Sequence, residues 1–439
     1  MAVTERATTD IIDELTAWLE ENWDPDLTCA QWWERLGLSG WAAPTLPENA
    51  YGKALSRNDG VRVQGEIARF GALGAPAGLG LLLAAPTIAT HGTQEQIDRY
   101  VKDIVTGQQA WCQLFSEPGA GSDLAGLTTK AVRDGDEYVI NGQKVWTSGG
   151  QIADLGMLLA RTNFDVPKHQ GITWFAFDMH QPGVDVRPLR ELTGRAMFNE
   201  VFMSDAHVPA DAIIGDLNNG WAAANTTLAH ERAGLGSGGG DGGYGAAMPG
   251  TVAGFLDRPA GEFAPKSEAG KAAASSGRGG RGNGAKLFID LAKGNGTIKD
   301  PSLRQGLMKL YTLNEIGRIN GLRVKAEKEK GREIPGMGNI SKLSMSEIMR
   351  LTRDLGLRIV GPSGMLHAYT GEDRKVLDSA TGNPFLGMVT EMALFAQAPP
   401  IYGGTDQVQR NIIGERVLGL PKEPNDDKVR PFSELPKNA

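Results

Sequence analysis

The chain has 439 residues, of which 41% are hydrophobic and 22% are charged, an ordinary composition for a water-soluble globular protein of two or three domains. Its formal net charge of -7 argues against nucleic acid as the main partner. The two cysteines, Cys29 and Cys112, lack the spacing of a metal site or a disulfide framework, so we expect no metal and a reducing, cytoplasmic location. We also expect no membrane span, because the longest uncharged run, residues 70–90, is interrupted by glycines and prolines.

Residues 1–110 are predicted to form a helical domain. In residues 9–24, Ile11, Leu15 and Leu19 recur at the spacing of one helix face. Further helical segments are expected at residues 32–38, 60–72 and 94–105.

From Trp111 the pattern changes to short alternating segments, so residues 111–215 are predicted to form a β-domain. Asp134-Gly135 and Asn141-Gly142 are favoured two-residue hairpin turns, and they flank a half-buried strand. Further strands are expected at residues 155–161, 172–179, 184–189 and 199–209.

Residues 216–420 return to a helical pattern that begins at 221–236. Two later stretches suit long antiparallel helices of a bundle joined through a turn at residues 331–339. A last helix is expected near residues 407–416, and residues 421–439 are expected to form a polar tail. The apolar residues at helical spacing in the two long stretches are Leu303, Leu307, Leu310 and Leu313, then Ile348, Leu351, Leu355 and Ile359.

Residues 236–285 form a glycine-rich insertion within this helical region. A helix does not tolerate so many glycines, so a long surface loop or a partly disordered segment is expected. Its Arg-Gly-Gly run could be read as an RNA-binding segment, but the run is short and the protein is acidic. A flexible surface loop is the preferred interpretation.

The segment Gln113–Thr129 holds a tight polar turn, Ser116-Glu117-Pro118-Gly119-Ala120-Gly121-Ser122-Asp123. The glycines allow backbone N–H groups to approach a ligand closely, and the serine and aspartate can add hydrogen bonds. Such a turn suits a phosphate or a diphosphate, although most turns of this composition bind no ligand.

This turn, the Trp146-Thr147-Ser148 strand end and the segment Tyr402-Gly403-Gly404-Thr405 together resemble the motifs of acyl-CoA dehydrogenases, over residues 33–421. The resemblance implies an α+β fold with a helical N-terminal domain, a central β-barrel-like domain and a C-terminal four-helix bundle. It also implies an enzyme that uses FAD to remove two hydrogens from the α and β carbons of an acyl-CoA thioester. An electron-transfer flavoprotein would then reoxidise the flavin.

The resemblance also indicates where the catalytic base lies. In many family members a glutamate follows the tyrosine of the C-terminal motif, but Gly403 holds that position here. The isovaleryl and long-chain members place the base in a Glu-Arg pair on the first helix of the C-terminal domain. Glu231 is the matching residue, and the alternative is that it is only a solvated helix residue. The backbone N–H of Gly403 is implied to bind the thioester carbonyl.

The implied flavin contacts carry over residue by residue. They are contacts to three parts of the cofactor, namely the flavin ring, the diphosphate and the ADP part. Phe115 and Ser116 match positions beside the ring, Gly121 and Ser122 the diphosphate turn, Trp146 and Ser148 the isoalloxazine and its N5 side, and Thr405 and Gln407 the ADP part.

Two family motifs that complete a neighbouring subunit's FAD site are altered. An R-x-x-F-G segment is lacking between residues 220 and 319, and the Q-x-x-G-G-x-G turn reads Arg358 to Gly364 with Arg for Gln and Pro for Gly. This pattern is similar to actinobacterial α2β2 acyl-CoA dehydrogenases, several of which act on steroid side-chain thioesters. We therefore expect the Glu-bearing subunit of a hetero-oligomer.

Two other functions remain open from the sequence. The chain could be a non-catalytic or FAD-site-completing subunit of a heteromeric acyl-CoA dehydrogenase, or it could be a flavin oxidase or monooxygenase on the same fold. Flavin bleaching by an acyl-CoA and oxygen consumption are the observations that separate these alternatives.

Overall fold

The computed structural model describes residues 8–236, 255–266, 284–383, 385–424 and 426–436. The chain divides into two compact units, each described by itself. Among the described residues, no helix has both the length and the apolar character needed to cross a membrane. Unit 1 comprises Met1–Leu189, Met197–Gly280 and Asn425–Ala439, and unit 2 comprises Arg190–Ala196 and Arg281–Pro424.

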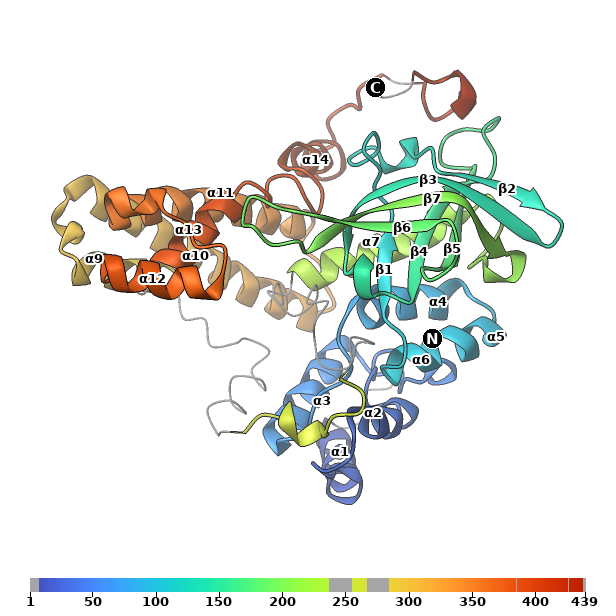
Figure 1. The fold of residues 1–439 in the computed structure, drawn as a ribbon, viewed down its shortest axis with the longest axis horizontal. Helices are drawn as coiled ribbons and strands as arrows, with labels where there is room; N and C mark the ends of the chain where they lie inside the picture. Colours follow the sequence, from blue (N-terminus) through green and yellow to red (C-terminus); the bar gives the residue numbers. More distant parts are fainter. Residues whose placement is uncertain (1–7, 237–254, 267–283, 384, 425, 437–439) are drawn as a thin grey trace. The chain divides into compact units, whose positions relative to one another are not determined.

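Unit 1 begins with helices, as predicted (blue in Figure 1). A capping box of Thr28 and Gln31 starts the second of them. Trp32 and Trp33 are buried in the core of this region, and their indole N–H groups donate to backbone carbonyls at 2.7 Å. The helices are α1 Thr8–Asn22, α2 Cys29–Leu38, α3 Arg57–Phe70, α4 Ala85–His91, α5 Gln94–Gln96 and α6 Lys102–Val105, with π-helical turns at Gly80–Ala84 and Ile97–Val101.

Part of the glycine-rich insertion is packed against these helices. The backbone N–H of Cys29 donates to the Arg258 carbonyl at 2.8 Å, and that of Ala30 donates to the Leu256 carbonyl at 3.0 Å. Ala260 is fully buried in the same core. The expectation of a flexible surface loop is therefore wrong for residues 255–266, because their apolar side chains find a core to join. Residues 237–254 and 267–283 lie outside the described residues.

A curled seven-stranded sheet follows, with β1, β4, β2, β3, β7 and β6 in that order and β5 paired to β4. The central strand β4 pairs parallel to β1 and antiparallel to β5. Figure 1 shows β3, β7 and β6 as neighbouring arrows. The strands are β1 Trp111–Leu114, β2 Lys130–Asp134, β3 Glu137–Ser148, β4 Leu155–Arg161, β5 Ile172–Asp178, β6 Val184–Leu189 and β7 Phe198–Pro209.

Only one of the two predicted hairpin turns exists. Gly135 makes the β2–β3 turn with a φ of 58°, as expected for this position. The turn predicted at Asn141-Gly142 is wrong, because β3 continues through it and pairs with β7 across a register shift. A Cβ at Gly142 would lie 2.5 Å from Thr129 Oγ1, so glycine serves close packing at this point.

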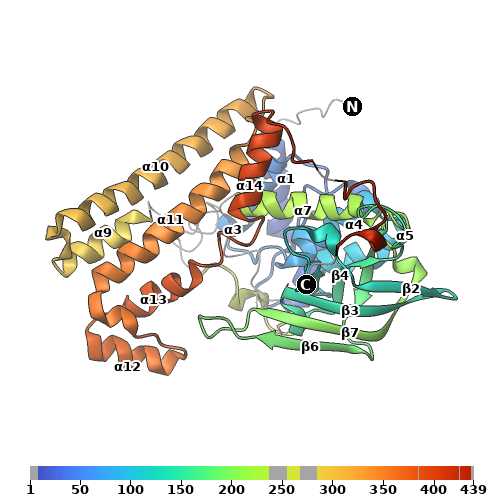
Figure 2. The same ribbon diagram turned by 90° about the horizontal axis from the view of Figure 1, so that it is seen from above.

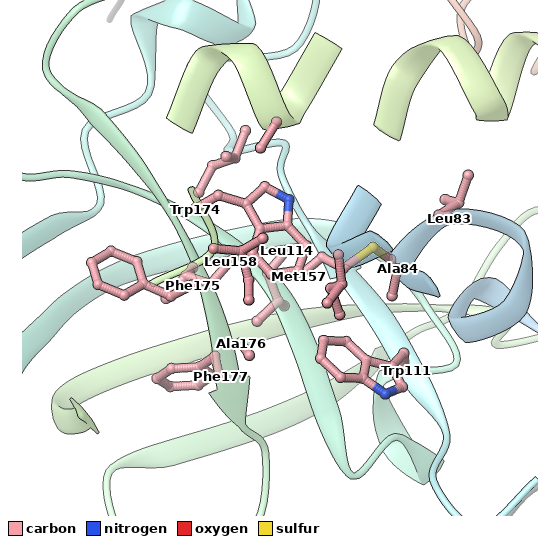
Figure 3. Close-up of a cluster of buried hydrophobic side chains, with 14 of the residues drawn as sticks. Leu83, Ala84, Trp111, Leu114, Met157, Leu158, Trp174, Phe175, Ala176 and Phe177 are labelled. Atoms are coloured by element: carbon pink, nitrogen blue, oxygen red, sulfur yellow. The ribbon is translucent and has the colours of Figure 1, made fainter. Parts of the chain in front are cut away.

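Large aromatic side chains from β1 and β5 are buried in the core of unit 1 (Figure 3). Trp111 and Trp174 lie with ring centroids 6.4 Å apart, and Phe175 and Phe177 are fully buried. Helix α7, Gly220–Gly236, adds buried alanines to the same core. This core joins β1 to α7, the two elements that carry the candidate site.

Unit 2 contains the helical C-terminal region, also as predicted. Four of its helices, α9, α10, α11 and α13, contribute to one hydrophobic core, and Figure 2 shows α10 and α11 running side by side. Helix α14 continues as a π-helical turn at Ile413–Val417. The helices are α9 Ala285–Gly294, α10 Pro301–Glu329, α11 Met337–Val360, α12 Gly371–Thr381, α13 Leu386–Phe395 and α14 Asp406–Ile412.

Candidate active site

The connection between β1 and β2, residues 115–129, is called the β1 loop below. Glu117 and Ala120 exchange two backbone hydrogen bonds of 3.0 Å, which close a tight turn. Gly121 and Ser122 are exposed at its tip, and no described atom lies within 4 Å of a Cβ placed on Gly121. The tip therefore leaves room for an anionic group to approach the backbone.

A buried carboxylate anchors this loop. Glu117 accepts hydrogen bonds from the backbone N–H of Thr128 at 2.7 Å and of Thr129 at 2.8 Å, and Lys144 Nζ lies 2.8 Å from its Oε1. Burial alone would raise the pKa of Glu117, but the Lys144 ammonium and these donors outweigh burial and hold the pKa at about 2. The charged pair thus ties both ends of the β1 loop to β3.

Trp146 lies beside this loop with its indole uncovered. Its side chain is 61% exposed, and its backbone adopts a φ of 62°, which costs a non-glycine residue free energy. Phe198 packs edge-on against the ring at 5.9 Å. The neighbouring Val145 N–H donates to the Ser116 carbonyl at 2.9 Å, so β3 and the β1 loop are joined here. The exposed indole and the strained backbone make Trp146 a candidate contact for a ligand.

Three other predicted residues occupy this part of unit 1. Phe115 is buried in the core and Ser116 is half-buried, at the start of the loop. Ser148 is half-buried and pairs with Phe198 in the β3–β7 ladder. The structure therefore brings Phe115, Ser116, Trp146 and Ser148 to two neighbouring strand ends.

Glu231 lies on α7 and is half-buried. Its Oε2 accepts a hydrogen bond of 3.3 Å from Gln113 Nε2, on β1. Two further side-chain contacts fix α7 to α4, Thr87 Oγ1 with Thr227 Oγ1 at 2.9 Å and His91 Nε2 with Thr226 Oγ1 at 2.8 Å. The carboxylate is therefore held at the strand that leads into the β1 loop.

Gln113 was not predicted as a site residue. The available signal is its position in β1, where a polar side chain stands between the fully buried Cys112 and Leu114. A polar residue in an otherwise apolar short strand usually needs a partner, and here Glu231 is one.

The remaining predicted residues belong to unit 2. Gly403 and Gly404 have φ values of 61° and 79°, and Gln409 Nε2 donates to the Gly403 carbonyl at 3.0 Å. Thr405 caps α14, because its Oγ1 accepts from the Val408 N–H at 3.1 Å. Gln407 is exposed in the first turn of that helix. The segment thus forms a glycine turn followed at once by the capped N-terminus of α14.

Asp406, which follows Thr405, anchors this turn. Its carboxylate is buried and accepts from Ser346 Oγ at 2.7 Å and from Arg350 Nη2 at 3.1 Å, and Lys342 Nζ lies 3.4 Å away. Burial acts to raise the pKa of Asp406, but these donors and the Lys342 charge lower it. The start of α14 is therefore fixed by three side chains of α11.

Three family models match successive parts of the chain. The N-terminal domain of acyl-CoA dehydrogenase matches residues 2–108, the middle domain matches residues 112–206 and the C-terminal domain matches residues 290–418.

Individual relatives support the same family. The chain is 33% identical to acyl-CoA dehydrogenase IpdE1 of Mycobacterium tuberculosis over 392 residues, which covers 89% of this chain and 88% of IpdE1. It is 56% identical over 155 residues to acyl-CoA dehydrogenase FadE34 of the same organism, which covers 35% of this chain but only 22% of FadE34.

Two solved structures are similar over nearly the whole chain. The "Tcur3481-Tcur3483 steroid ACAD" is 25% identical with a TM-score of 0.65, covering 96% of this chain and 100% of that one. A chain of the ChsE4-ChsE5 complex from Mycobacterium tuberculosis is 25% identical with a TM-score of 0.61 and has the same coverage.

Proposed function

The chain belongs to the acyl-CoA dehydrogenase family, whose members are oxidoreductases acting on CH–CH groups, and we propose that it catalyses FAD-dependent α,β-dehydrogenation of an acyl-CoA thioester. The observation that carries the proposal is the contact between Gln113 and Glu231, which holds a carboxylate at the strand leading into the β1 loop. It matters because the alternative position for a base holds Gly403, which has no side chain.

The residues present fit a flavin. The uncovered indole of Trp146 offers an aromatic face, the half-buried Ser148 a hydroxyl donor, and the open turn at Gly121 and Ser122 a place for a diphosphate. Phe115 and Ser116 would line the ring side. In unit 2, Thr405 and Gln407 at the start of α14 would bind the ADP part. FAD, when bound, supplies the acceptor for the β-hydrogen as hydride.

The chain's own residues would handle the proton and the developing charge. Glu231 takes the α-proton onto its carboxylate, and Gln113 orients that carboxylate through its amide N–H. The family resemblance, rather than any placement of unit 2 relative to unit 1, supports the backbone N–H of Gly403 as the donor to the thioester oxygen, where negative charge grows as the proton leaves. A base of this kind contributes about 10² to 10⁴ in rate.

We further propose a fatty-acyl or steroid side-chain thioester as substrate. The relatives that support this are the steroid ACAD structure and the isovaleryl and long-chain acyl-CoA dehydrogenases among the similar proteins. Gly403 in place of a glutamate also leaves room for a bulky acyl group.

The proposed assembly is an α2β2 hetero-oligomer with a second acyl-CoA dehydrogenase subunit, and an electron-transfer flavoprotein is the proposed acceptor. Arg358, in place of the family glutamine, donates to Asp300 at 2.9 Å and to Ser302 at 2.6 Å. This side chain is thus engaged at the start of α10 in its own chain. The similarity to the ChsE4-ChsE5 complex points the same way.

The experiment that tests the function is an anaerobic titration of the purified protein with a panel of acyl-CoAs, monitored by flavin absorbance. Wild type should bleach with one class of thioester, and Glu231→Gln should retain FAD but bleach at least about 100-fold more slowly. Glu21→Gln, an exposed glutamate on α1, is the matched control and should behave as wild type. Equal bleaching rates in wild type and Glu231→Gln would exclude this residue as the base.

Other outcomes identify the alternatives. Colourless protein that acquires FAD on co-expression with a second acyl-CoA dehydrogenase subunit, and in which Glu231→Gln then leaves bleaching unchanged, would indicate a non-catalytic or site-completing role for this chain. Oxygen consumption without an added electron acceptor would indicate an oxidase or a monooxygenase.

A further inference from the structure

The last described segment, residues 426–436, is called the C-terminal strap below. It lies on the connection between β4 and β5 within unit 1 (dark red in Figure 1). The backbone N–H of Phe432 donates to the Val166 carbonyl at 2.9 Å, and that of Ser433 donates to the Phe164 carbonyl at 2.8 Å. This part of the predicted polar tail is thus hydrogen-bonded to the connection between β4 and β5.

The C-terminal strap covers a buried charge. The centroid of the Phe432 ring lies 3.5 Å from the guanidinium carbon of Arg161, whose side chain is fully buried. Arg161 donates to the carbonyls of Ala125 at 2.6 Å and Leu127 at 3.1 Å. Both carbonyls belong to the β1 loop, directly after its tip. The ring therefore closes the site of a cation that holds the backbone of the β1 loop.

A second contact joins the strap to the tip of the same loop. Lys168 Nζ lies 2.9 Å from one oxygen of Asp123 and 3.4 Å from Asp427 of the strap. The Lys168 side chain is 9% exposed, whereas Asp123 and Asp427 are 50% and 37% exposed, so the lysine is held in place but water partly screens both ion pairs. Asp123 follows Ser122, the residue proposed to face the diphosphate.

We propose that the C-terminal strap is a positioning element for the flavin site, in which Phe432 and Asp427 act through Arg161 and Lys168 to fix the conformation of the β1 loop. This inference rests on the proposed function for its flavin part. A backbone turn binds an anion well only when its N–H groups are already oriented, because ordering the turn on binding costs free energy. Loss of the strap would therefore weaken FAD binding without removing a flavin contact.

The first test needs no flavin. Hydrogen exchange is measured on the apoprotein at the amides of Gly126 and Leu127, which donate to Asp123 and Leu124 within the loop. Phe432→Ala, and a chain ending at residue 424, should exchange there about tenfold faster than wild type. Val429→Ala, a 74% exposed residue of the same strap, is the matched control and should match wild type, as should the amides of β5 in every variant.

Equal exchange in wild type and in folded Phe432→Ala would overturn the inference. If the chain ending at residue 424 does not fold, the hydrogen exchange of Phe432→Ala alone tests the inference.

The second test is the FAD dissociation constant, read from flavin fluorescence. Phe432→Ala should bind FAD about tenfold more weakly than wild type, and Val429→Ala within about twofold. If wild type binds FAD and Phe432→Ala binds it with the same dissociation constant, the inference about the strap is overturned but the proposed function is not. A wild type with no affinity for FAD, both alone and when co-expressed with a second acyl-CoA dehydrogenase subunit, would overturn the proposed function and, with it, the flavin part of this inference.

Discussion

Lys144 Nζ lies 2.8 Å from Glu117 Oε1, and both side chains are buried where β3 meets the β1 loop. The lysine also donates to the Phe115 carbonyl at 3.0 Å, so it binds the start of the loop while Glu117 binds the end. A buried pair of this kind is stabilising only as long as both partners are present.

Lys144→Met should therefore destabilise unit 1 strongly. The substitution leaves the Glu117 carboxylate buried without its counter-charge, which costs about 3–5 kcal/mol. Urea denaturation measures the loss, and Lys130→Met, at an exposed lysine of β2, is the control. A loss below about 1 kcal/mol would show that the pair does not hold the loop.

The free energy of unfolding should also depend on pH, because the pKa of Glu117 is lower in the folded protein. Its pKa lies near 2 in the folded protein against an ordinary value of 4.5, so the stabilisation is complete above about pH 4.5 and is lost as the pH falls towards 2. In that window the free energy of unfolding of wild type should fall relative to Glu117→Gln by up to roughly 1.4 kcal/mol per pH unit. Parallel pH profiles for the two proteins would contradict this assignment.

Much of the fold can be predicted from local pattern. Apolar spacing predicts the helix that forms at Thr8–Asn22, and the run at residues 155–161 coincides with β4. The turn at Asn141-Gly142 was predicted wrongly, because Asn-Gly is a strong local signal but β3 is paired on both sides, with β2 and β7. Tertiary pairing overrides turn preference there.

The candidate site could be predicted only in part, because some of its residues are defined by tertiary contacts rather than by local sequence pattern. Glycines and hydroxyls in the β1 loop and the cap at Thr405 are visible as sequence patterns. Arg161 and Lys168 are not, because charged residues are usually exposed and the partners of Arg161 are backbone carbonyls that no side-chain pattern reveals. The proposed role of Phe432 depends on its contact with Arg161, which is far away in the chain.

Gln113 should tune the proposed base. Gln113→Leu removes the amide that orients Glu231 and should lower kcat/KM about tenfold, less than Glu231→Gln does. Gln113→Glu should also move the acidic limb of the pH–rate profile to higher pH, because a second carboxylate at this distance disfavours the ionised base and raises its pKa. Gln108→Leu, at an exposed glutamine before β1, is the control. An unmoved profile in Gln113→Glu would show that the contact has no part in proton transfer.

In unit 2, Asp406→Asn should loosen the start of α14. The amide keeps the shape of the carboxylate but not its charge, and its NH2 group cannot accept, so the two cations lose their counter-charge and one of Lys342 and Arg350 loses its acceptor. A broken charged hydrogen bond of this kind costs about 1–3 kcal/mol, which should appear as a lower Tm. Asp354→Asn, at an exposed aspartate of α11, is the matched control.

Asp406→Asn also tests whether the start of α14 contributes to FAD binding in addition to stability. If Thr405 and Gln407 bind the ADP part of the flavin, Asp406→Asn should weaken FAD binding as well as stability, because the cap that presents them is held by Asp406. Binding of FMN, which lacks the AMP portion of FAD, should then be the same in wild type and Asp406→Asn. An equal loss of affinity for FAD and FMN would instead mean that the substitution disturbs the fold beyond α14, and α14 would no longer be supported as the site of the ADP part.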